Sequence, residues 1–500
     1  MTNPEYNPEE LFQLADGRYI TSPEISEKMK YIKEHHPETA WQDDSTGYSW
    51  DEAGITDLFA ECYKNDTRYC PEMKSWFTYE GGRWKKDVGS LLISAKIKEF
   101  ARLMALYCGE IKDDDIRRRY MAFVSRLGNR RPREQIMKDA ADSLRVEARM
   151  FDSHPYLINC LNGTYDLLEG VFREHDWRDF LTMQSNFEYT RQKISCKRWN
   201  DFIKEVTEGD KDKADYLQRA LGYSILGTCH EECMFILYGK STRNGKSTLL
   251  NTIQHLLGDY ATVAPVELIC RSDRTRNAES ATSTLAGLKG RRFVTMAESD
   301  TSGKLDEAVI KQYTGGEEIT ARRLYENAIT FMPQFTMWLS CNDLPAVRDK
   351  SLFASDRVRV IEFNRHFSDE EQDKTLKAYF ESPEAMKGIF AWLIRGYERY
   401  KTFGLTMPES MKPVMRAYAK DNDIVLQFLE DRCERDENTI KAKTLYDAYK
   451  TWCRSNGYYV CSLKRFVAEV TAHPEWYETK GLTHGAVRFD GITLKEVRNE

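Results

Sequence analysis

MFILYGKSTRNGKSTLLNTIQHLL, residues 234–257, is the most informative segment of this 500-residue chain. Five apolar residues are followed by a loop with two glycines and then by a helical pattern, which predicts a strand, a loop and a helix. A triphosphate is held by backbone N–H groups that glycine conformations turn inward, with the positive end of a helix behind them. The segment therefore predicts a nucleotide-binding loop.

Residues of this loop have expected roles. Lys246 is expected to reach the β- and γ-phosphates, and Ser247 to hold Mg²⁺. Five residues rather than the usual four separate the two glycines, so we expect the additional residue to bulge at the tip, residues 240–242. The expected cofactors are ATP and Mg²⁺, and the expected binding residues are Gly239, Asn244, Gly245, Lys246, Ser247 and Thr248.

A carboxylate must orient water and support the metal, because a phosphate loop alone does not hydrolyse ATP. The apolar run 293–296 leads directly to Glu298, which would lie at the carboxyl end of a strand, where ligands of open α/β sheets bind. We expect Glu298 to be this acid, with Asp300 as the alternative. An ordinary surface acid is the other interpretation.

Two further strands end or begin at polar residues. Asn342 follows the apolar run 335–340, where its amide could sense the γ-phosphate; a turn-forming Asn is the alternative. Arg357 and Arg359 enter the run 358–363. In ring ATPases such an arginine offsets transition-state charge at the neighbour's nucleotide. Arg357 is the expected finger. Arg359 remains an alternative, because residues two positions apart in a strand point to the same face.

Between the acid and Asn342, residues 319–325 alternate and turn at 326–328, which predicts a β-hairpin. Hairpins that track a nucleic-acid backbone need basic side chains for phosphates and an aromatic residue for packing. A solvated charged hairpin is the alternative. The expected DNA-binding residues are Lys311, Arg322, Arg323 and Tyr325.

Composition limits the remaining possibilities. Length predicts roughly three domains of about 150 residues. The formal charge of -6, from 73 basic and 79 acidic residues, argues against a uniformly basic DNA-coating protein, so any DNA contact must be local. No apolar run of membrane-spanning length and no signal peptide is present, so we expect a cytoplasmic protein without membrane contact.

Twelve scattered cysteines predict reduced, mostly buried thiols. The tightest cluster, Cys229, His230 and Cys233, has no second ligand pair at finger-like spacing, which disfavours a zinc site.

Along the chain we expect five regions, of which the first, 1–110, is an α+β region with a strand–turn–strand around 76–84. The second, 111–195, has an arginine-dense start and a hairpin at Asn162–Gly163. The α/β core, 196–370, is followed by a helical linker or lid, 371–430, and by a C-terminal region, 431–500. Arg117–Arg119 with Arg130, Arg131 and Arg133 suggest a DNA-entry collar. In 431–500, two helices joined at Asn456–Gly457 precede a short hairpin. Six basic residues there (Lys441, Lys443, Lys450, Arg454, Lys464, Arg465) oppose Asp447 and Glu469, a local +4 that favours DNA or an acidic partner face; a solvated helix pair is the alternative.

In this order the motifs resemble superfamily 3 helicases, specifically the phage, plasmid and poxvirus primase–helicase family with a D5-type N-terminal domain. The resemblance rests on NGKST at 244–248, Glu298, IKQYTGGEEITARRLY at 310–325, SCNDLP around Asn342 and RVRVIEF at 357–363. It extends to GIFAWLIRGYERYKTFGLTMPE at 388–409, and upstream to RYCPEMKSWFTYEGGRWKKD and INCLNGTYDLLEG.

The resemblance implies an α/β fold: an AAA+-like P-loop ATPase core with a parallel sheet, a small α+β D5-type region before it, and a helical region and a winged-helix domain after it. It implies an ATP-dependent DNA helicase that assembles as a ring, usually a hexamer, and translocates on single-stranded DNA during replication of a phage, prophage or mobile element. The implied catalytic residues are Lys246, Glu298 (Walker B acid), Asn342 (sensor 1) and Arg357 (finger). Implied partners are single-stranded or forked DNA, further copies of the chain, and a separate primase or other replication proteins.

No primase activity is expected, since the first 110 residues contain no apolar strand with an Asp-x-Asp pair. Two other functions remain open: an origin-binding initiator or loader with little unwinding, and a P-loop motor that remodels protein or packages DNA.

Overall fold

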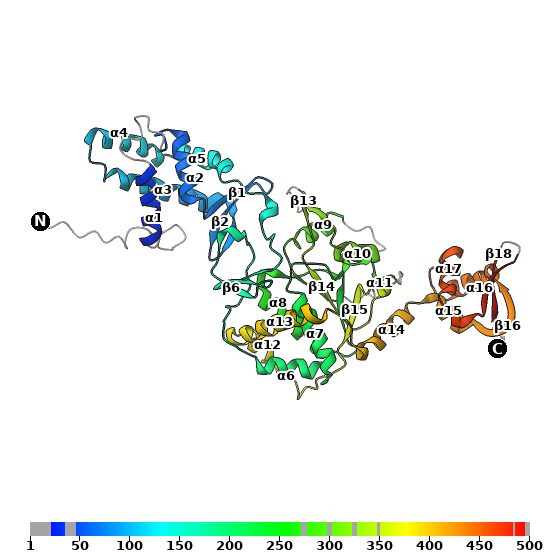
Figure 1. Ribbon diagram of the computed structural model, residues 1–500. Coiled ribbons are helices and arrows are strands. Elements are labelled where there is room, and N and C mark those ends of the chain that lie inside the picture. Colours follow the sequence, from blue (N-terminus) through cyan, green and yellow to red (C-terminus); the bar gives the residue numbers. More distant parts are fainter. Residues whose placement is uncertain are drawn as a thin grey trace.

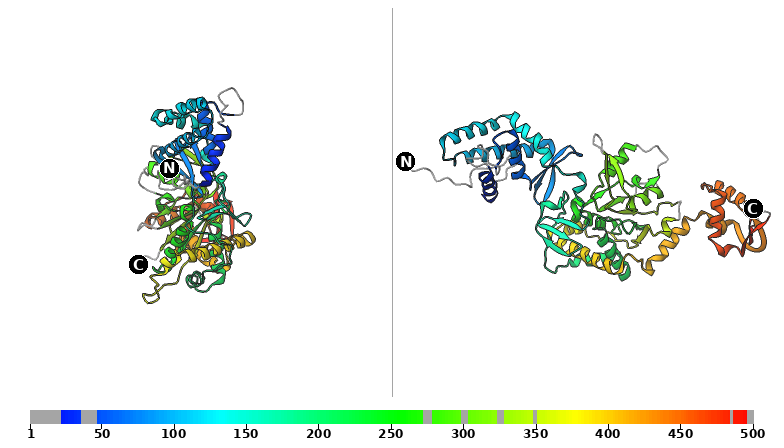
Figure 2. Two further views of the ribbon diagram at one scale, coloured as in Figure 1. Left: turned by 90° about the vertical axis from the view of Figure 1, so that its left-hand side faces the viewer. Right: turned by 45° about the horizontal axis from the view of Figure 1, so that its top comes forward.

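The computed structural model describes residues 22–35, 47–271, 278–297, 303–322, 328–347, 351–483 and 486–495. Three parts follow one another along the molecule: a helical N-terminal part, a central domain with a parallel sheet, and a C-terminal domain at the opposite end (Figure 1). The right-hand view of Figure 2 shows the same order. None of the helices in these ranges combines the length and apolar character that a membrane span requires.

The expected parallel sheet is present, with five strands in the order β15-β7-β14-β10-β8. The register pairs Tyr238 with both Cys341 and Glu362, and Ala297 with Ser340. The carboxyl ends of four strands therefore meet at one edge, where ligands of open parallel sheets bind. The strands are β7 (Met234–Tyr238), β8 (Ala261–Val263), β10 (Phe293–Ala297), β14 (Thr336–Cys341) and β15 (Val358–Glu362).

Helices bury both faces of this sheet. Along β7, Phe235 and Leu237 belong to one apolar core and Met234 and Ile236 to another, because alternate side chains of a strand point to opposite faces. The first core contains residues of α6 (Lys197–Val206), α7 (Lys211–Tyr223), α8 (Lys246–Leu257), α12 (Leu376–Phe380) and α13 (Pro383–Phe403). The second contains residues of α9 (Ala278–Ala286), α10 (Glu307–Thr314), α11 (Ser351–Ala354) and α14 (Lys412–Asp421).

The N-terminal part has its own apolar core, which runs from Ile32 to Leu144. Phe100 and Tyr107 of α3 share this core with Tyr120 of α4 and Ile136 of α5, so the division expected at residue 110 falls inside it. Its helices are α1 (Ser22–His35), α2 (Glu52–Tyr63), α3 (Leu91–Cys108), α4 (Asp114–Ser125) and α5 (Arg130–Ser143), beside the antiparallel sheet β1 (Thr67–Cys70), β2 (Ser75–Glu80) and β3 (Arg83–Asp87). The predicted strand–turn–strand around 76–84 is confirmed as β2 and β3.

The hairpin predicted at Asn162–Gly163 is confirmed, since β4 and β5 pair antiparallel with Cys160 opposite Gly163. Ile158 and Tyr165 of this hairpin lie in the first core of the central domain. Residues 111–195 therefore divide between two units: the helices join the N-terminal core and the strands join the central one. The strands are β4 (Leu157–Cys160), β5 (Gly163–Asp166) and β6 (Val171–Arg173).

A second predicted hairpin is present in the central domain. Ile319 of β12 (Ile319–Arg322) pairs with Phe331 of β13 (Ala328–Phe331), and both side chains enter the second core. A short antiparallel pair, β9 (Cys270–Arg271) with β11 (Lys304–Leu305), completes the domain.

The C-terminal domain has a separate core that begins at Val425, within the region expected to be a helical lid. The predicted pair of helices joined at Asn456–Gly457 is confirmed, with Gly457 at φ +71°, as is the terminal hairpin. The elements are α15 (Ile424–Arg432), β16 (Cys433–Lys441), α16 (Ala442–Ser455), α17 (Leu463–Thr471), β17 (Thr479–Thr483) and β18 (Ala486–Leu494), with sheet order β16-β18-β17.

Short 3₁₀ turns connect elements throughout the described chain: Val88–Ser90, Arg126–Gly128, Ala148–Met150, Trp177–Asp179, Gly258–Tyr260 (η7), Val266–Leu268, Glu409–Met411 and Pro474–Trp476.

All twelve cysteines are free, and nine of them are buried. Cys229 donates from Sγ to the carbonyl oxygens of Pro333 and Phe335, and His230 hydrogen-bonds the hydroxyl of Tyr400. Across the described ranges, no group of three His, Cys, Asp or Glu side chains could hold a metal ion. The cluster at Cys229 and His230 is therefore occupied by ordinary packing contacts.

Candidate nucleotide site

The loop between β7 and α8 has the backbone that a phosphate-binding loop needs. Gly245, immediately before α8, has φ +88°, a left-handed conformation that a residue with a side chain adopts only at a cost. Asn244 and Lys246 on either side of it are buried, whereas Lys240 and Thr242 are exposed. The longer loop thus keeps its exposed residues at the tip and its buried residues next to the helix.

Two contacts hold the far side of the loop. The backbone N–H of Phe367 donates to the carbonyl oxygen of Arg243 at 2.9 Å, and His366 Nδ1 lies 2.9 Å from the carbonyl oxygen of Thr242. Arg243 also forms an ion pair with Asp369. The segment after β15 therefore supports the loop.

Lys246 joins the loop to the neighbouring strand. Its Nζ donates to the carbonyl oxygen of Gly239 at 3.0 Å and to Oδ1 of Asn342 at 2.9 Å, and the residue is only 5 % exposed. The phosphate loop and Asn342, predicted from two separate motifs, are thereby brought together at the carboxyl edge of the sheet. An ammonium group that contacts neutral oxygens here is positioned to bind phosphate oxygens.

A hydroxyl group that could hold a metal ion follows this lysine in the chain. Ser247 is exposed in the first turn of α8, and its hydroxyl oxygen is a ligand that Mg²⁺ accepts. The described part of β10 ends at Ala297, at the same edge of the sheet. Glu298, Arg323 and Tyr325, three of the predicted site residues, lie outside the described residues.

Arg357 and Arg359 have different surroundings. Arg357, immediately before β15, pairs with Glu232 and donates from Nη1 to Oγ1 of Thr314 at 2.8 Å, and 17 % of its side chain is exposed. Arg359 is buried and donates to the carbonyl oxygens of Asp356 at 3.1 Å and Leu405 at 2.8 Å. The burial of Arg359 fits a structural role, whereas Arg357 is partly exposed.

Two acids that sequence reasoning missed hold these arginines. Glu232 pairs with Arg357, and Oε2 of Glu231 lies 3.3 Å from Nη2 of Arg359. Burial lowers the pKa of Arg359, but the opposing influence of Cys233, Tyr216 and Glu231 is larger, so its pKa lies above the ordinary value. About 125 residues separate each acid from its arginine, and no local spacing signals such a pair.

A cavity adjoins the loop on the side of α14. It has a volume of about 610 Å³ and is lined by Tyr238, Lys240 and Ser241 together with Pro413, Val414 and Ala417 of α14. Tyr418 anchors α14 by donating its hydroxyl to the carbonyl oxygen of Pro345 at 2.5 Å. The rest of the lining is mixed, with Leu344 and Tyr418 beside the polar side chains of Glu362, Asn364 and Asp421. A pocket with one apolar wall and several polar groups beside a phosphate loop can accommodate the base and sugar of a nucleotide.

The predicted DNA-binding residues are dispersed. Arg322 ends the exposed side of β12, opposite Ala328, in the hairpin. Lys311 lies on α10 and donates from Nζ to Oγ of Ser351 at 2.7 Å, inside the central domain.

The arginines expected to form a collar lie on α4 and α5, where several have local partners. Arg118 pairs with Asp115 at 2.5 Å, Arg130 pairs with Glu134 at 2.6 Å, and Arg117 pairs with Asp114. Arg133 donates to the carbonyl oxygens of Leu127 and Gly128. Local neutralisation makes this cluster a weaker attractor of DNA than its arginine count suggests.

Three protein families match parts of this chain. Residues 56–208 match "D5 N terminal like", residues 237–357 match "Family of unknown function (DUF5906)", and residues 420–485 match "Poxvirus D5 protein-like". The second match begins in β7 and ends at Arg357, so it covers the nucleotide site.

Viral proteins are similar to longer parts of the chain. A "Putative helicase" of Acanthamoeba polyphaga mimivirus is 27 % identical over 441 residues, which are 80 % of this chain and 45 % of that protein. A "Putative helicase" of Frog virus 3 is 26 % identical over 276 residues, 51 % of this chain and 28 % of that protein. A "Putative primase" of African swine fever virus is 22 % identical over 353 residues, 66 % of this chain and 34 % of that protein. The chain spans less than half the length of these relatives.

Among solved structures, two apo forms of the "NrS-1 C terminal region" align with 88 % and 89 % of this chain and with 98 % and 100 % of their own length. Their sequence identities to it are 10 % and 11 %, and their TM-scores are 0.47 and 0.48.

Proposed function

The chain belongs to the D5-type primase–helicase family, and from this premise we propose that its central domain is an AAA+-like ATPase that drives a superfamily 3 DNA helicase. The observation that carries the proposal is the contact of the buried Lys246 ammonium with both Gly239 and Asn342 at the carboxyl edge of the sheet. It connects the loop after β7 to the residue after β14. A γ-phosphate that displaced these oxygens would change the contacts of the residues that follow β7 and β14 at the same time.

The proposed roles at the nucleotide follow from position. Backbone N–H groups of the loop from Gly239 to Thr248 bind the phosphates, with the N-terminus of α8 behind them. Ser247 and Glu298 hold Mg²⁺, which offsets the charge on the phosphates. Asn342 orients the γ-phosphate or the attacking water. The cavity beside α14 receives the base and sugar.

Arg357 is proposed to act at the nucleotide of a neighbouring subunit in a ring, usually a hexamer. Its partial exposure supports this role, and the burial of Arg359 argues against Arg359 as the finger. Because Glu232 holds Arg357 within its own chain, the arginine must leave Glu232 before it can reach another subunit.

Single-stranded DNA is the proposed track. The β12–β13 hairpin with Arg322 would contact it, and the family's viral relatives suggest a role in replicating a virus or another mobile element. The C-terminal domain, with three helices and a three-stranded antiparallel sheet, is proposed to be winged-helix-like and to bind DNA or an acidic partner. No primase activity is proposed for this chain; a primer-synthesis assay on single-stranded template would contradict that if it yielded product.

The test is Lys246→Ala compared with Lys374→Ala, which removes an exposed lysine from the same domain. We expect Lys246→Ala to lower ATP hydrolysis by about 100-fold or more, as for loss of other donors to developing negative charge. Lys374→Ala should behave as the unchanged protein does. Phosphate release and strand separation of a forked DNA report the two activities.

Strand separation by Lys246→Ala at the unchanged rate would refute the helicase mechanism. ATP hydrolysis with tight duplex binding but without strand separation would favour the initiator or loader. ATP hydrolysis that DNA does not affect would favour a motor on protein.

A further inference from the structure

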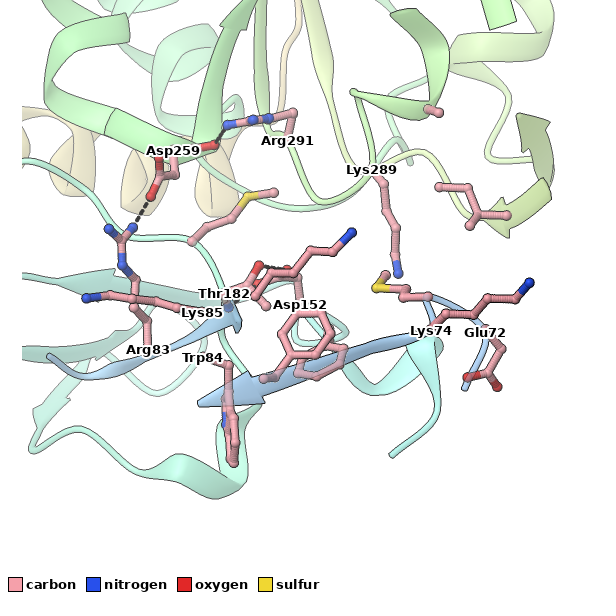
Figure 3. Close-up of a pocket in the computed structure, with 17 residues that line it drawn as sticks. Glu72, Lys74, Arg83, Trp84, Lys85, Asp152, Thr182, Asp259, Lys289 and Arg291 are labelled. Carbon is pink, nitrogen blue, oxygen red and sulfur yellow. Dashed lines mark hydrogen bonds and ion pairs between the residues drawn. The ribbon is translucent and has the colours of Figure 1, made fainter. Parts of the chain in front are cut away.

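A cavity of about 530 Å³ separates the β2–β3 hairpin from the central domain (Figure 3). Its walls come from segments far apart in sequence: residues 72–86, 151–152, 182–183, 259, 286–291 and 329. In Figure 3, Arg83 extends from β3 toward Asp259, and Lys289 approaches the same space from the central domain. The cavity therefore lies where two units of the fold meet.

Hydrogen bonds fix its two sides relative to each other. The backbone N–H of Trp84 donates to the carbonyl oxygen of Leu181 at 2.8 Å, and Nδ2 of Asn159 donates to that of Gly82 at 3.0 Å. Arg83 forms an ion pair with Asp259 of η7. These contacts attach the turn end of the hairpin, residues 82–84, to the central domain, so the cavity is part of the folded structure and needs little rearrangement before binding.

The lining is basic although the chain as a whole is acidic. Six basic side chains face three acidic ones, a local charge of +3 against -6 for the whole sequence. The basic residues are Lys74, Arg83, Lys85, Lys86, Lys289 and Arg291, and the acidic residues are Glu72, Asp152 and Asp259.

The acids are already engaged, whereas some donors are not. Asp259 pairs with Arg83, and Oδ1 of Asp152 accepts the backbone N–H of Thr182 at 2.8 Å. Burial raises the pKa of the Asp152 carboxyl. Within the described chain, the side-chain ammonium of Lys74 has no hydrogen bond or ion pair, and Nε of Arg83 is buried without an acceptor. An anion that enters would meet unused donors.

The aromatic residues of the lining do not offer free faces. Phe77 packs against Phe151 in a tilted pair with ring centroids 4.4 Å apart, Trp84 stacks on Phe180 at 5.8 Å, and all three lining rings are buried. The cavity can therefore recognise charge but cannot insert its rings between bases. The matching ligand is a phosphate backbone, bound without regard to sequence.

Ile329 connects the cavity to the hairpin proposed to contact DNA. It lines the cavity, belongs to β13, and pairs with Ala321, the neighbour of Arg322. The cavity therefore adjoins the hairpin on the side of Ala321 and Ile329, whereas Arg322 lies on the exposed side of β12.

We propose that this cavity binds the phosphate backbone of single-stranded nucleic acid and continues the DNA path from the β12–β13 hairpin to the β2–β3 hairpin. The proposal rests on the proposed function in taking DNA as the polymer. It gives the D5-like N-terminal part of the chain a direct contact with the DNA strand.

The test measures binding of a fluorescent oligothymidylate by anisotropy over a series of salt concentrations. Lys74→Ala with Lys85→Ala removes two exposed lysines of the cavity, and Lys98→Ala with Lys138→Ala removes two exposed lysines from α3 and α5 as the matched control. We expect the cavity variant to bind several-fold more weakly. The slope of log K against log salt should fall by roughly 1.4, about 0.7 per lost phosphate contact. Lys74→Arg with Lys85→Arg should restore both quantities.

Equal affinity and equal slope in the cavity variant and the control would overturn the proposal, as would an acidic peptide that fills the cavity without displacing the oligonucleotide. If the unchanged protein unwinds DNA while the cavity variant keeps its slope, only the cavity proposal fails. If the slope changes as expected but no ATP-driven unwinding occurs, only the helicase proposal fails.

Discussion

The proposed nucleotide site at the carboxyl edge of the parallel sheet and the basic cavity at the β2–β3 hairpin both carry charged side chains, but they are assembled in different ways. The first is built mainly from short runs that follow single strands, such as the loop after β7 and Asn342 after β14. The second takes its side chains from six separate segments. A site built from contiguous residues can be identified from the sequence. A site built from distant segments can be identified only from the folded structure, which brings those segments together.

The largest expected effect tests whether the nucleotide edge is complete within one chain. Arg357→Ala should lower ATP hydrolysis by roughly 10³-fold, because a finger that offsets transition-state charge contributes about that much. Mixing Arg357→Ala with Lys246→Ala subunits should restore part of the activity, since some interfaces then pair an intact loop with an intact finger. Phosphate release at several mixing ratios is the measurement. No recovery at any ratio would place the arginine and the loop in the same subunit.

Arg359 should behave differently although it is only two residues away. Arg359→Ala leaves Glu231 with Tyr400 as its remaining partner and the buried carbonyl group of Leu405 without its donor, which we expect to lower the free energy of unfolding by about 2 kcal/mol. Urea denaturation followed by tryptophan fluorescence measures this change. A variant as stable as the unchanged protein but without ATPase activity would reverse the assignment of the two arginines.

The smallest effect concerns the pair that spans 125 residues. Glu232→Gln keeps the size of the side chain but weakens its hold on Arg357, and a partly exposed pair is worth at most about 1 kcal/mol. We expect ATP hydrolysis by the assembled protein to rise by up to about 5-fold. Steady-state rates at saturating ATP measure it, with Glu231→Gln as the control. A fall in rate would show that Glu232 positions Arg357 for its task.

Much of the fold was predictable because its signals are local. The apolar run 234–238 followed by Gly245 and Lys246 predicted β7, the loop and α8, and Asn162–Gly163 predicted the β4–β5 turn. The helix pair around Gly457 was predictable for the same reason. Each prediction depends on residues that act on their immediate neighbours.

Long-range packing explains what was not predicted. Phe100 and Tyr120 share one core across the boundary expected at residue 110, and nothing in either segment signals the other. Glu232 finds Arg357 only because the turn before β7 lies beside the start of β15, where the backbone N–H of Met234 donates to the carbonyl oxygen of Arg357. Such contacts follow from the arrangement of strands and leave no spacing in the sequence.

The buried thiols have a practical consequence. Burial raises the pKa of Cys62, Cys160 and Cys229 to about 12, and maleimide dyes react with the thiolate, so these three thiols should label slowly at neutral pH. A cysteine introduced at Thr330 on the hairpin or at Lys138 on α5, both exposed, should be modified before them. Dyes at these two positions would let fluorescence energy transfer follow the hairpin relative to the N-terminal helices when ATP is added.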